Sequence, residues 1–318
     1  MRYFIIIAVT LASLPVNAQT ERIVFKLPEF YPEGIAYNNR TATFYVGSVK
    51  TGTIAAIDKL GKATTFYEDR SLKSSFGMKI DSARSILWVC TGDPNYSIYA
   101  DSATYKKMIR IVGIDLGTGK KVKDYDLSGL KAGEHFANDL TIDNKGNLYI
   151  TDSYSPVIYR IDKEGRATVW AESELFKSLD IGLNGIVWHP SGFLLAVNNN
   201  KGSIIKISTE SPATVQPVKT RTFFPGADGL LINSAGNLVL VQNKGVNKVF
   251  ELSSTDNWQS AMVKAATASE DRFQQPSTCV LGRGKLYVVN SKLNELQDPG
   301  ITPSKEFSLQ LAVFRPVQ

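Results

Sequence analysis

Short apolar runs alternate with turn residues along almost the whole chain. Runs rich in Val, Ile, Leu, Tyr and Phe, such as "FYVGS", "LYITD" and "LVLVQN", are typical of β-strands. Between such runs lie turns in which Asp, Asn or His comes first and Gly comes fourth: "DKLG", "DNKG", "DKEG", "HPSG" and "NSAG". In a turn of this kind the first side chain bonds the backbone, and Gly supplies a positive φ. No long helical periodicity competes, so the pattern predicts an all-β protein.

The strand pattern also repeats. Six segments open in a similar way, and each is followed by a turn and an apolar strand: "PEGIAYN", "FGMKID", "ANDLTID", "LNGIVWH", "ADGLLIN" and "PSTCVL". We take six positions as equivalent: Glu33, Phe76, Asn138, Asn184, Asp228 and Pro276. The intervals between them are 43, 62, 46, 44 and 48 residues. Six units of this length predict a six-bladed β-propeller with four-stranded blades.

Two strand-like segments fall outside the repeats, "ERIVFKL" near the start of the chain and "SLQLAVF" near its end. We expect both to join the sixth blade, because this would close the ring and pair strand edges that would otherwise be exposed. No linker or low-complexity segment interrupts the repeats, so residues 19–318 are predicted to form one propeller domain.

The first 18 residues have the pattern of a secretory signal peptide. Arg2 supplies a positive charge, an apolar run follows from Phe4 to Leu14, and small residues precede a cleavage site near Ala18. No later segment approaches the roughly 18 apolar residues that a membrane span needs. These features predict a secreted or periplasmic protein without a membrane span, and we expect it to be a monomer.

Composition and charge argue against a nucleic-acid partner and against a disulfide bridge. The formal net charge of +6 comes from scattered Lys and Arg residues with no basic run, which predicts a solvated surface rather than a nucleic-acid partner. Cys90 and Cys279 are two cysteines in a chain long enough to bury a large core, so they are interpreted as buried thiols rather than as a bridge.

Four of the six equivalent positions carry side-chain oxygens: Glu33, Asn138, Asn184 and Asp228. If all innermost strands of a propeller run the same way, their starting residues converge at one end of the central channel. Two carboxylates and two amides suit a hard cation, because calcium accepts six to eight oxygen ligands of both kinds. The alternative is turn chemistry, since Gly34, Gly185 and Gly229 follow three of these residues and polar strand starts are common. No Cys/His cluster favours zinc.

The motifs "PEG", "ANDLTIDNKGNLYITD", "LNGIVWHPSG" and "ADGLLI" resemble the senescence marker protein (regucalcin)/gluconolactonase/luciferin-regenerating-enzyme-like family, within the calcium-dependent phosphotriesterase superfamily. The resemblance covers essentially the whole chain after the signal peptide. It implies a six-bladed propeller with a divalent ion, usually calcium, held by Glu33, Asn138, Asn184 and Asp228. It also implies hydrolysis of a lactone, an ester or a phosphotriester, with Asp228 as general base or as nucleophile.

One departure from the family bears on the substrate. Sugar-lactone members carry Arg two residues before the third-blade Asn, where this chain has Phe136. With Phe223 and Phe224, Phe136 predicts an apolar wall of the substrate pocket, with blade packing as the alternative. An apolar lactone or ester is therefore the expected small-molecule substrate.

Two further residues are assigned roles near the predicted metal. His135 lies three residues before Asn138 and is a candidate proton shuttle, although a surface histidine is as good an interpretation. Asp139 follows a predicted ligand and is expected either to support that ligand from behind or to stabilise a turn.

Two rival functions come from other classes. One is a non-catalytic propeller that recognises a peptide or glycan and holds a structural ion. The other is a strictosidine-synthase-like propeller without this metal sphere, which the four-oxygen pattern disfavours. Fold alone does not decide between an enzyme and a binding protein.

Overall fold

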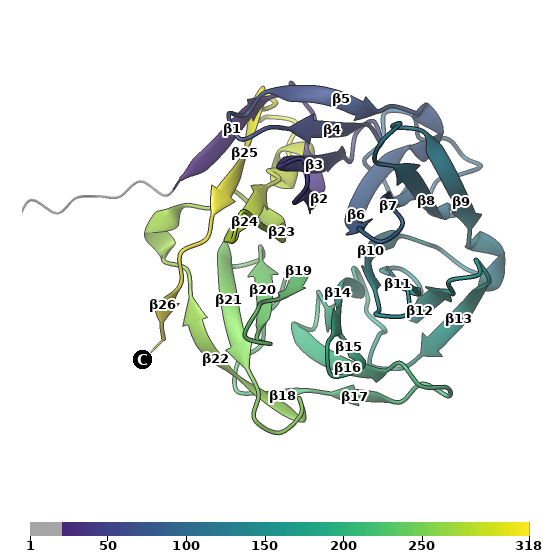
Figure 1. The fold of residues 1–318 in the computed structure, drawn as a ribbon, viewed down its shortest axis with the longest axis vertical. Coiled ribbons are helices and arrows are strands. Elements are labelled where there is room, and N and C mark those ends of the chain that lie inside the picture. The colour runs from purple at the N-terminus through teal and green to yellow at the C-terminus, as the bar shows by residue number, and fades with distance from the viewer. Residues whose placement is uncertain (1–20, 318) are drawn as a thin grey trace, which may run out of the picture.

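The computed structural model describes residues 21–317. Six β-sheets surround a central channel, and the innermost strands converge on its axis (Figure 1). Each blade begins with its inner strand and ends with its outer strand. The first three are β2 (Pro32–Asn38), β3 (Thr43–Ser48), β4 (Ile54–Ile57) and β5 (Ala63–Tyr67) in blade 1; β6 (Ser74–Asp81), β7 (Ile86–Gly92), β8 (Ile109–Asp115) and β9 (Lys121–Asp126) in blade 2; β10 (Ala137–Ile142), β11 (Leu148–Asp152), β12 (Val157–Ile161) and β13 (Ala167–Glu172) in blade 3.

The other three blades follow the same order: β14 (Leu183–His189), β15 (Phe193–Asn198), β16 (Ser203–Ser208) and β17 (Val215–Pro217) in blade 4; β19 (Ala227–Ile232), β20 (Leu238–Gln242), β21 (Lys248–Ser253) and β22 (Ser260–Ala266) in blade 5; β23 (Pro276–Gly282), β24 (Lys285–Asn290), β25 (Glu306–Leu311) and β1 (Arg22–Lys26) in blade 6. The predicted six-bladed, four-stranded architecture is confirmed. The predicted signal peptide lies outside the described residues.

The ring closes as predicted, because strands from both ends of the chain share blade 6. The N-terminal strand β1 pairs antiparallel with β25, with Val24 opposite Ser308. A short C-terminal strand, β26 (Arg315–Pro316), pairs with β22 and so fastens the end of the chain to blade 5. The linker strand β18 (Lys219–Thr220) pairs with the start of β22, at Ser260 and Ala261. Blade 5 therefore has no free outer edge at these points.

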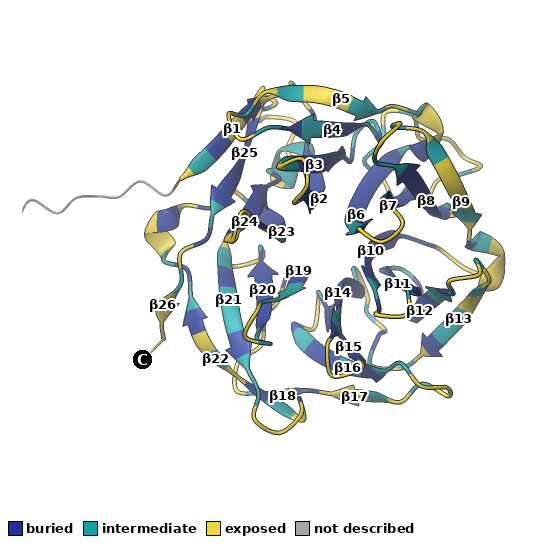
Figure 2. Ribbon diagram, in the orientation of Figure 1, coloured by how far each residue is buried: buried dark blue, intermediate teal, exposed yellow. Residues whose placement is uncertain are grey.

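Burial falls from the axis outward. The inner strands β2 and β14 are buried almost throughout, whereas the outer strand β9 is largely exposed (Figure 2). Apolar side chains of neighbouring blades interlock and form the core, as Phe44 of blade 1 does with Tyr287 of blade 6 at 5.1 Å between ring centroids. Cys90 and Cys279 are both free and buried, as predicted.

The predicted turns form as expected. In four of them the Asp or Asn side chain accepts two backbone N–H groups, as Asp143 does from Lys145 and Asn147. In the "HPSG" turn the His189 ring accepts one from Ser191. Short 3₁₀ turns supply the remaining regular structure: Arg70–Leu72, Ser128–Leu130, Ser269–Asp271 and Leu293–Leu296. Among the described residues, no helix is long and apolar enough to cross a membrane.

Candidate metal centre

Every inner strand carries a bulge at the same point, and these bulges build the site. Pairing of the inner strand with its neighbour skips two residues in each blade: between Pro32 and Ile35, and at the corresponding points of the other five. A bulge leaves its residues outside the ladder and re-aims their side chains. The first bulge residues are Glu33, Phe76, Asn138, Asn184, Asp228 and Ser277.

The structure corrects one of the six positions taken as equivalent. Pro276 pairs with Asn290 just before its bulge, as Pro32 pairs with Ser48 in blade 1. Ser277, not Pro276, therefore corresponds to Glu33. The Ser277 hydroxyl donates to the Glu33 carbonyl at 2.7 Å, so blade 6 contributes a brace for blade 1.

The four oxygen-bearing residues lie at equivalent points of four blades and are buried, with exposed fractions between 4% and 7%. Three of their oxygens have no hydrogen-bond partner within the described part of the chain: Glu33 Oε2, Asn138 Oδ1 and Asn184 Oδ1. A buried polar atom left unpaired costs about 1–3 kcal/mol. One electropositive group placed among the three blades would satisfy all of these atoms at once.

We call the four residues Glu33, Asn138, Asn184 and Asp228 the ring. The surroundings of its two carboxyl groups oppose their ionisation. Burial raises the pKa of Asp228 to about 8, against hydrogen bonds from Asn243 and Asn184 that lower it. Burial, then the Asp228 carboxylate, raises the pKa of Glu33 well above its usual range. Two acids that resist ionisation in this way are held where a cation would relieve both.

Polar residues at the ends of the second strands position the ring. In blade 5, Asn243 donates to Asp228 Oδ2 at 2.6 Å and to the Pro276 carbonyl at 3.1 Å. In blade 4, Asn199 donates to the Ala227 carbonyl at 2.9 Å, directly before Asp228. In blade 3, Thr151 donates to the Asn184 carbonyl at 2.7 Å. Blades 3, 4 and 5 thus each hold the inner strand of the next blade at its bulge. The sequence signal was the polar ending of each second strand, as in "LVLVQN", but their pairing partners were not evident.

Asp139, the second bulge residue of blade 3, braces three blades. Its carboxylate accepts backbone N–H groups from Leu140 at 2.8 Å and from Ile186 of blade 4 at 3.3 Å. Lys79 of blade 2 lies 3.7 Å from its Oδ1. The predicted role of Asp139, to support a ligand from behind, stays a prediction, and its contacts place it between the strands that carry Asn138 and Asn184.

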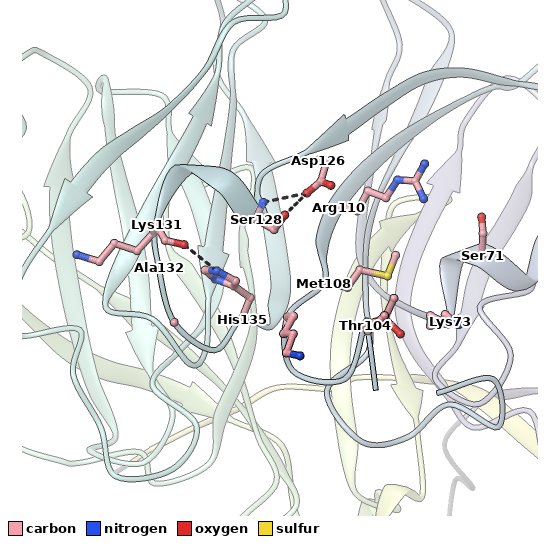
Figure 3. A pocket seen from close by; sticks show the side chains of 13 residues that line it. Ser71, Lys73, Thr104, Met108, Arg110, Asp126, Ser128, Lys131, Ala132 and His135 are labelled. Carbon is pink, nitrogen blue, oxygen red and sulfur yellow. Dashed lines mark hydrogen bonds between the residues drawn. The ribbon is translucent and has the colours of Figure 1, made fainter. Parts of the chain in front are cut away.

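His135 is held away from the ring by its own partners. Its Nδ1 lies 2.7 Å from Asp152 Oδ2 and its Nε2 lies 3.0 Å from the Lys131 carbonyl. Burial lowers the pKa of His135, but the Asp152 carboxylate outweighs this and the net shift is upward. His135 lines a cavity of about 460 Å³ to which no ring residue contributes. Figure 3 shows His135 among the side chains that line this cavity. Because both imidazole nitrogens already have hydrogen-bond partners, His135 is given no role in the proposed reaction.

The predicted aromatic wall is only partly in place. Phe224 has no exposed surface and packs on Phe250 inside blade 5, so assigning it to a pocket was wrong. Phe223 is 70% exposed on the loop before β19. Phe136 is buried and packs edge-on against Phe76, the blade 2 member of the ring positions, at 4.6 Å between centroids. Whether Phe136 faces substrate stays a prediction.

Tyr96 was missed by the sequence reasoning. It lies on the long loop 93–108, which the sequence marked only by an oversized interval. Burial, then the Asp228 and Glu33 carboxylates, raises the pKa of Tyr96 to about 12. The loop is fixed over blades 1 and 2 by a hydrogen bond from Ile98 N to the Lys50 carbonyl and by the Lys73–Asp101 ion pair. Tyr96 therefore lies on a loop held by blades 1 and 2, with its ring centroid 6.3 Å from that of Phe76.

The ring offers a metal ion oxygen ligands only. Among the described residues, no group of three or more His, Cys, Asp and Glu side chains is placed to hold a metal ion. The ring instead combines two carboxylates with two amides, which is an oxygen-only set of the sort that calcium accepts and zinc does not prefer.

Comparison with known proteins supports the fold. No protein-family model matches the chain, and no curated protein sequence matches it. Among solved structures, the chain is similar to the allergen Mala s 1 of Malassezia sympodialis, with a TM-score of 0.73 and 18% identity over 94% of this chain and 96% of that one.

Two further structures carry enzyme names. The chain is similar to a putative gluconolactonase, with a TM-score of 0.64 and 17% identity over 96% of this chain and 95% of that one. It is also similar to a luciferin-regenerating enzyme, with a TM-score of 0.64 and 16% identity over 92% and 96%. At these identities the likeness shows architecture alone. The chain is a six-bladed β-propeller with the fold found in gluconolactonases, luciferin-regenerating enzyme and the Malassezia allergen.

Proposed function

We propose that the chain is a calcium-dependent hydrolase that acts on an apolar lactone or ester, and by the same chemistry on a phosphotriester, at the ring of Glu33, Asn138, Asn184 and Asp228. The observation that carries this proposal is the set of three buried, unpartnered oxygens on three blades, with a fourth blade adding the carboxylate of Asp228. A bound calcium ion would polarise the carbonyl or phosphoryl oxygen of the substrate.

Asp228 is the residue assigned to the reaction. Asn243 holds its Oδ2 at 2.6 Å, which fixes the plane of the carboxylate. From that position Asp228 either takes a proton from the attacking water or attacks the substrate itself. The two routes differ in their product when water cleaves the acyl-enzyme anhydride at Cγ of Asp228. In a single turnover in ¹⁸O-water the acid released then carries a ¹⁶O atom from Asp228, whereas water activated by Asp228 as a base places ¹⁸O in that acid.

Aromatic side chains beside the ring support the proposed substrate class. Phe76 and Phe136 form an edge-on aromatic pair next to the ring, and Tyr96 lies within 6.3 Å of Phe76 between ring centroids. Aromatic side chains at this point favour aryl or alkyl groups, and they offer no guanidinium to the hydroxyls of a sugar lactone.

The test is hydrolysis of a panel of aryl esters, alkyl lactones, gluconolactone and a phosphotriester, with calcium and after chelation. We expect an aryl ester or alkyl lactone to be the best substrate, with activity that is lost on chelation and restored by calcium. Activity that persists in chelator contradicts the proposal. Calcium binding without turnover of any substrate favours the binding propeller, an alternative that is also supported by a structural neighbour named as an allergen rather than as an enzyme.

Stability of the metal-free protein is expected to fall as the pH rises from about 4 to about 8. The Asp228 carboxyl ionises near its usual value of 3.8 in the unfolded chain, but at about 8 in the folded protein. The folded state therefore holds more protons over that window, so each rise in pH favours unfolding. Calcium competes with these protons, so its stabilising effect should grow over the same window.

Thermal unfolding at about pH 5 and about pH 8.5, with calcium and with chelator, measures this effect. The increase in Tm caused by calcium should be larger at the higher pH. An equal increase at both pH values would mean that the buried carboxylates do not bind the ion.

We also propose that the chain is exported and cleaved near Ala18, on the basis of its N-terminal sequence pattern. That the chain is a monomer stays a prediction. Mass spectrometry of the protein recovered outside the cytoplasm should show a chain beginning at Gln19. A full-length mass beginning at Met1 would contradict export by this route.

A further inference from the structure

The channel has a second opening at the end opposite the ring, and it forms a cavity of about 580 Å³. Its lining comes from all six inner strands, from the residues that follow the bulges up to the hairpin turns at Asn39, Ser82, Pro190 and Asn233. The ring lies at the start of these strands, so the two sites are separated by the bulge layer. This volume falls within the range of small-molecule sites, about 300–1,000 Å³.

The wall of this cavity is apolar and reachable. Ile80, Ile142, Trp188 and Leu231 line it and are partly exposed. Leu281, at its rim, is 39% exposed. Large apolar side chains that stay partly exposed in a concave surface are the usual lining of a ligand site.

A single charged side chain, Lys79, contributes to this lining among the described residues. It breaks the internal repeat, because the corresponding positions of the other five blades carry small or apolar side chains: Ala36, Thr141, Val187, Leu231 and Val280. Its partner Asp139 breaks the repeat too, since the corresponding bulge positions are Gly34, Gly77, Gly185, Gly229 and Thr278. Two departures from the repeat thus face each other across neighbouring blades.

Within the Lys79–Asp139 pair, the Lys79 ammonium keeps hydrogen-bond donors for another ligand. The Nζ–Oδ1 distance is 3.7 Å, longer than a hydrogen bond. Asp139 is already hydrogen-bonded to two backbone N–H groups, and the Lys79 side chain is 24% exposed. An ammonium has three donors, so Lys79 can bind a further anion from the cavity while Asp139 stays where it is.

We propose that this second cavity binds a medium-chain aliphatic carboxylate. Its carboxylate accepts from Lys79 Nζ at the floor of the cavity, and its chain lies against Ile142, Trp188 and Leu281. An anionic head and an apolar tail match the two features of the lining, one cation and an apolar wall. The site is independent of the metal centre and requires no reaction there.

Decanoate is the probe, titrated by calorimetry and followed by fluorescence of Trp188, the one tryptophan that lines the cavity. We expect saturable binding of one decanoate per chain, and binding of the neutral decanol that is weaker by about tenfold or more. A Trp188→Phe variant should keep the heat of binding and lose the fluorescence change.

The decisive variant is Lys79→Met/Asp139→Asn, which removes both charges together so that no acid is left buried without its cation. It should bind decanoate about tenfold more weakly and decanol equally well. Lys62→Met, an exposed lysine on a hairpin, is the matched control and should bind as the wild type does. If the double variant fails to fold, Leu281→Asp places a negative charge at the rim instead and should weaken decanoate binding similarly.

Two results would overturn the proposal. One is the absence of saturable decanoate binding, or equal binding by wild type and both cavity variants. The other is loss of binding in Asp228→Asn with full binding in Leu281→Asp, which would place the carboxylate at the ring instead.

Discussion

Replacing Asp228 with asparagine is expected to lower kcat/KM for the best ester or lactone by about 10³-fold at saturating calcium. The amide keeps the size of the carboxyl group and one ligand oxygen, but it can neither take a proton from water nor form an acyl intermediate. It also removes one of the two negative charges of the ring, so the calcium concentration needed for half-maximal activity should rise.

The matched control is Asp58→Asn. Asp58 opens the hairpin between β4 and β5, where its Oδ1 accepts from Leu60 N and Lys62 N. An asparagine oxygen can accept the same two bonds, so this variant makes the same chemical change far from the ring. It should have wild-type activity. Undiminished activity in Asp228→Asn, measured at saturating calcium, would remove Asp228 from the reaction.

A Gly185→Ala substitution is expected to destabilise the fold by about 3 kcal/mol. Gly185 is the second bulge residue of blade 4, directly after Asn184. A Cβ there would lie 2.1 Å from the Asp228 carbonyl oxygen and 3.0 Å from Leu230 Cγ. The obstacle is the backbone of the neighbouring inner strand, which cannot give way without moving Asp228.

Urea unfolding of this variant, with chelator present, measures the effect without the contribution of calcium. Gly129→Ala is the control, because a Cβ at Gly129 meets nothing within 4 Å. The control should unfold within about 1 kcal/mol of the wild type. Equal stability of Gly185→Ala and the wild type would mean that the inner strands are less tightly apposed than the bulge geometry requires.

The architecture could be predicted because it follows from features that recur. The turn residues such as Asp143 and Gly146 repeat blade after blade, and the period of the strands limits the number of blades. Closure of the ring by β1 and β25 followed from the need to pair exposed edges. These are local or periodic signals, which a single sequence displays directly.

The candidate site was predicted less completely, because bulges have no single-residue signature. In blade 6 the sequence comparison matched Pro276 with Glu33, whereas the strand register matches Pro276 with Pro32 and Ser277 with Glu33. Phe224 failed for a related reason: an aromatic residue before an inner strand looks the same in sequence whether it faces a channel or a blade core. Asn243 contacts Asp228 from the end of the adjacent strand, and Tyr96 lies on the loop 93–108, so only the folded chain brings them near the ring.

Two irregularities of the repeat proved informative. Asp139 was singled out from the sequence because it stands next to Asn138, and the structure gives it a partner that sequence reasoning did not name. Lys79 lies on the neighbouring blade, 60 positions earlier in the chain, and its Nζ lies 3.7 Å from Asp139 Oδ1. Departures from an internal repeat are therefore worth comparing with one another in three dimensions.

The central claim, that the four-oxygen ring binds a cation, is tested most directly by calorimetric titration of calcium into chelator-treated protein. We expect one calcium ion per chain, and weaker binding by about tenfold or more in Glu33→Gln, which keeps the shape of the ring and removes one charge. Failure of the wild-type protein to bind calcium, or identical binding by Glu33→Gln, would contradict it.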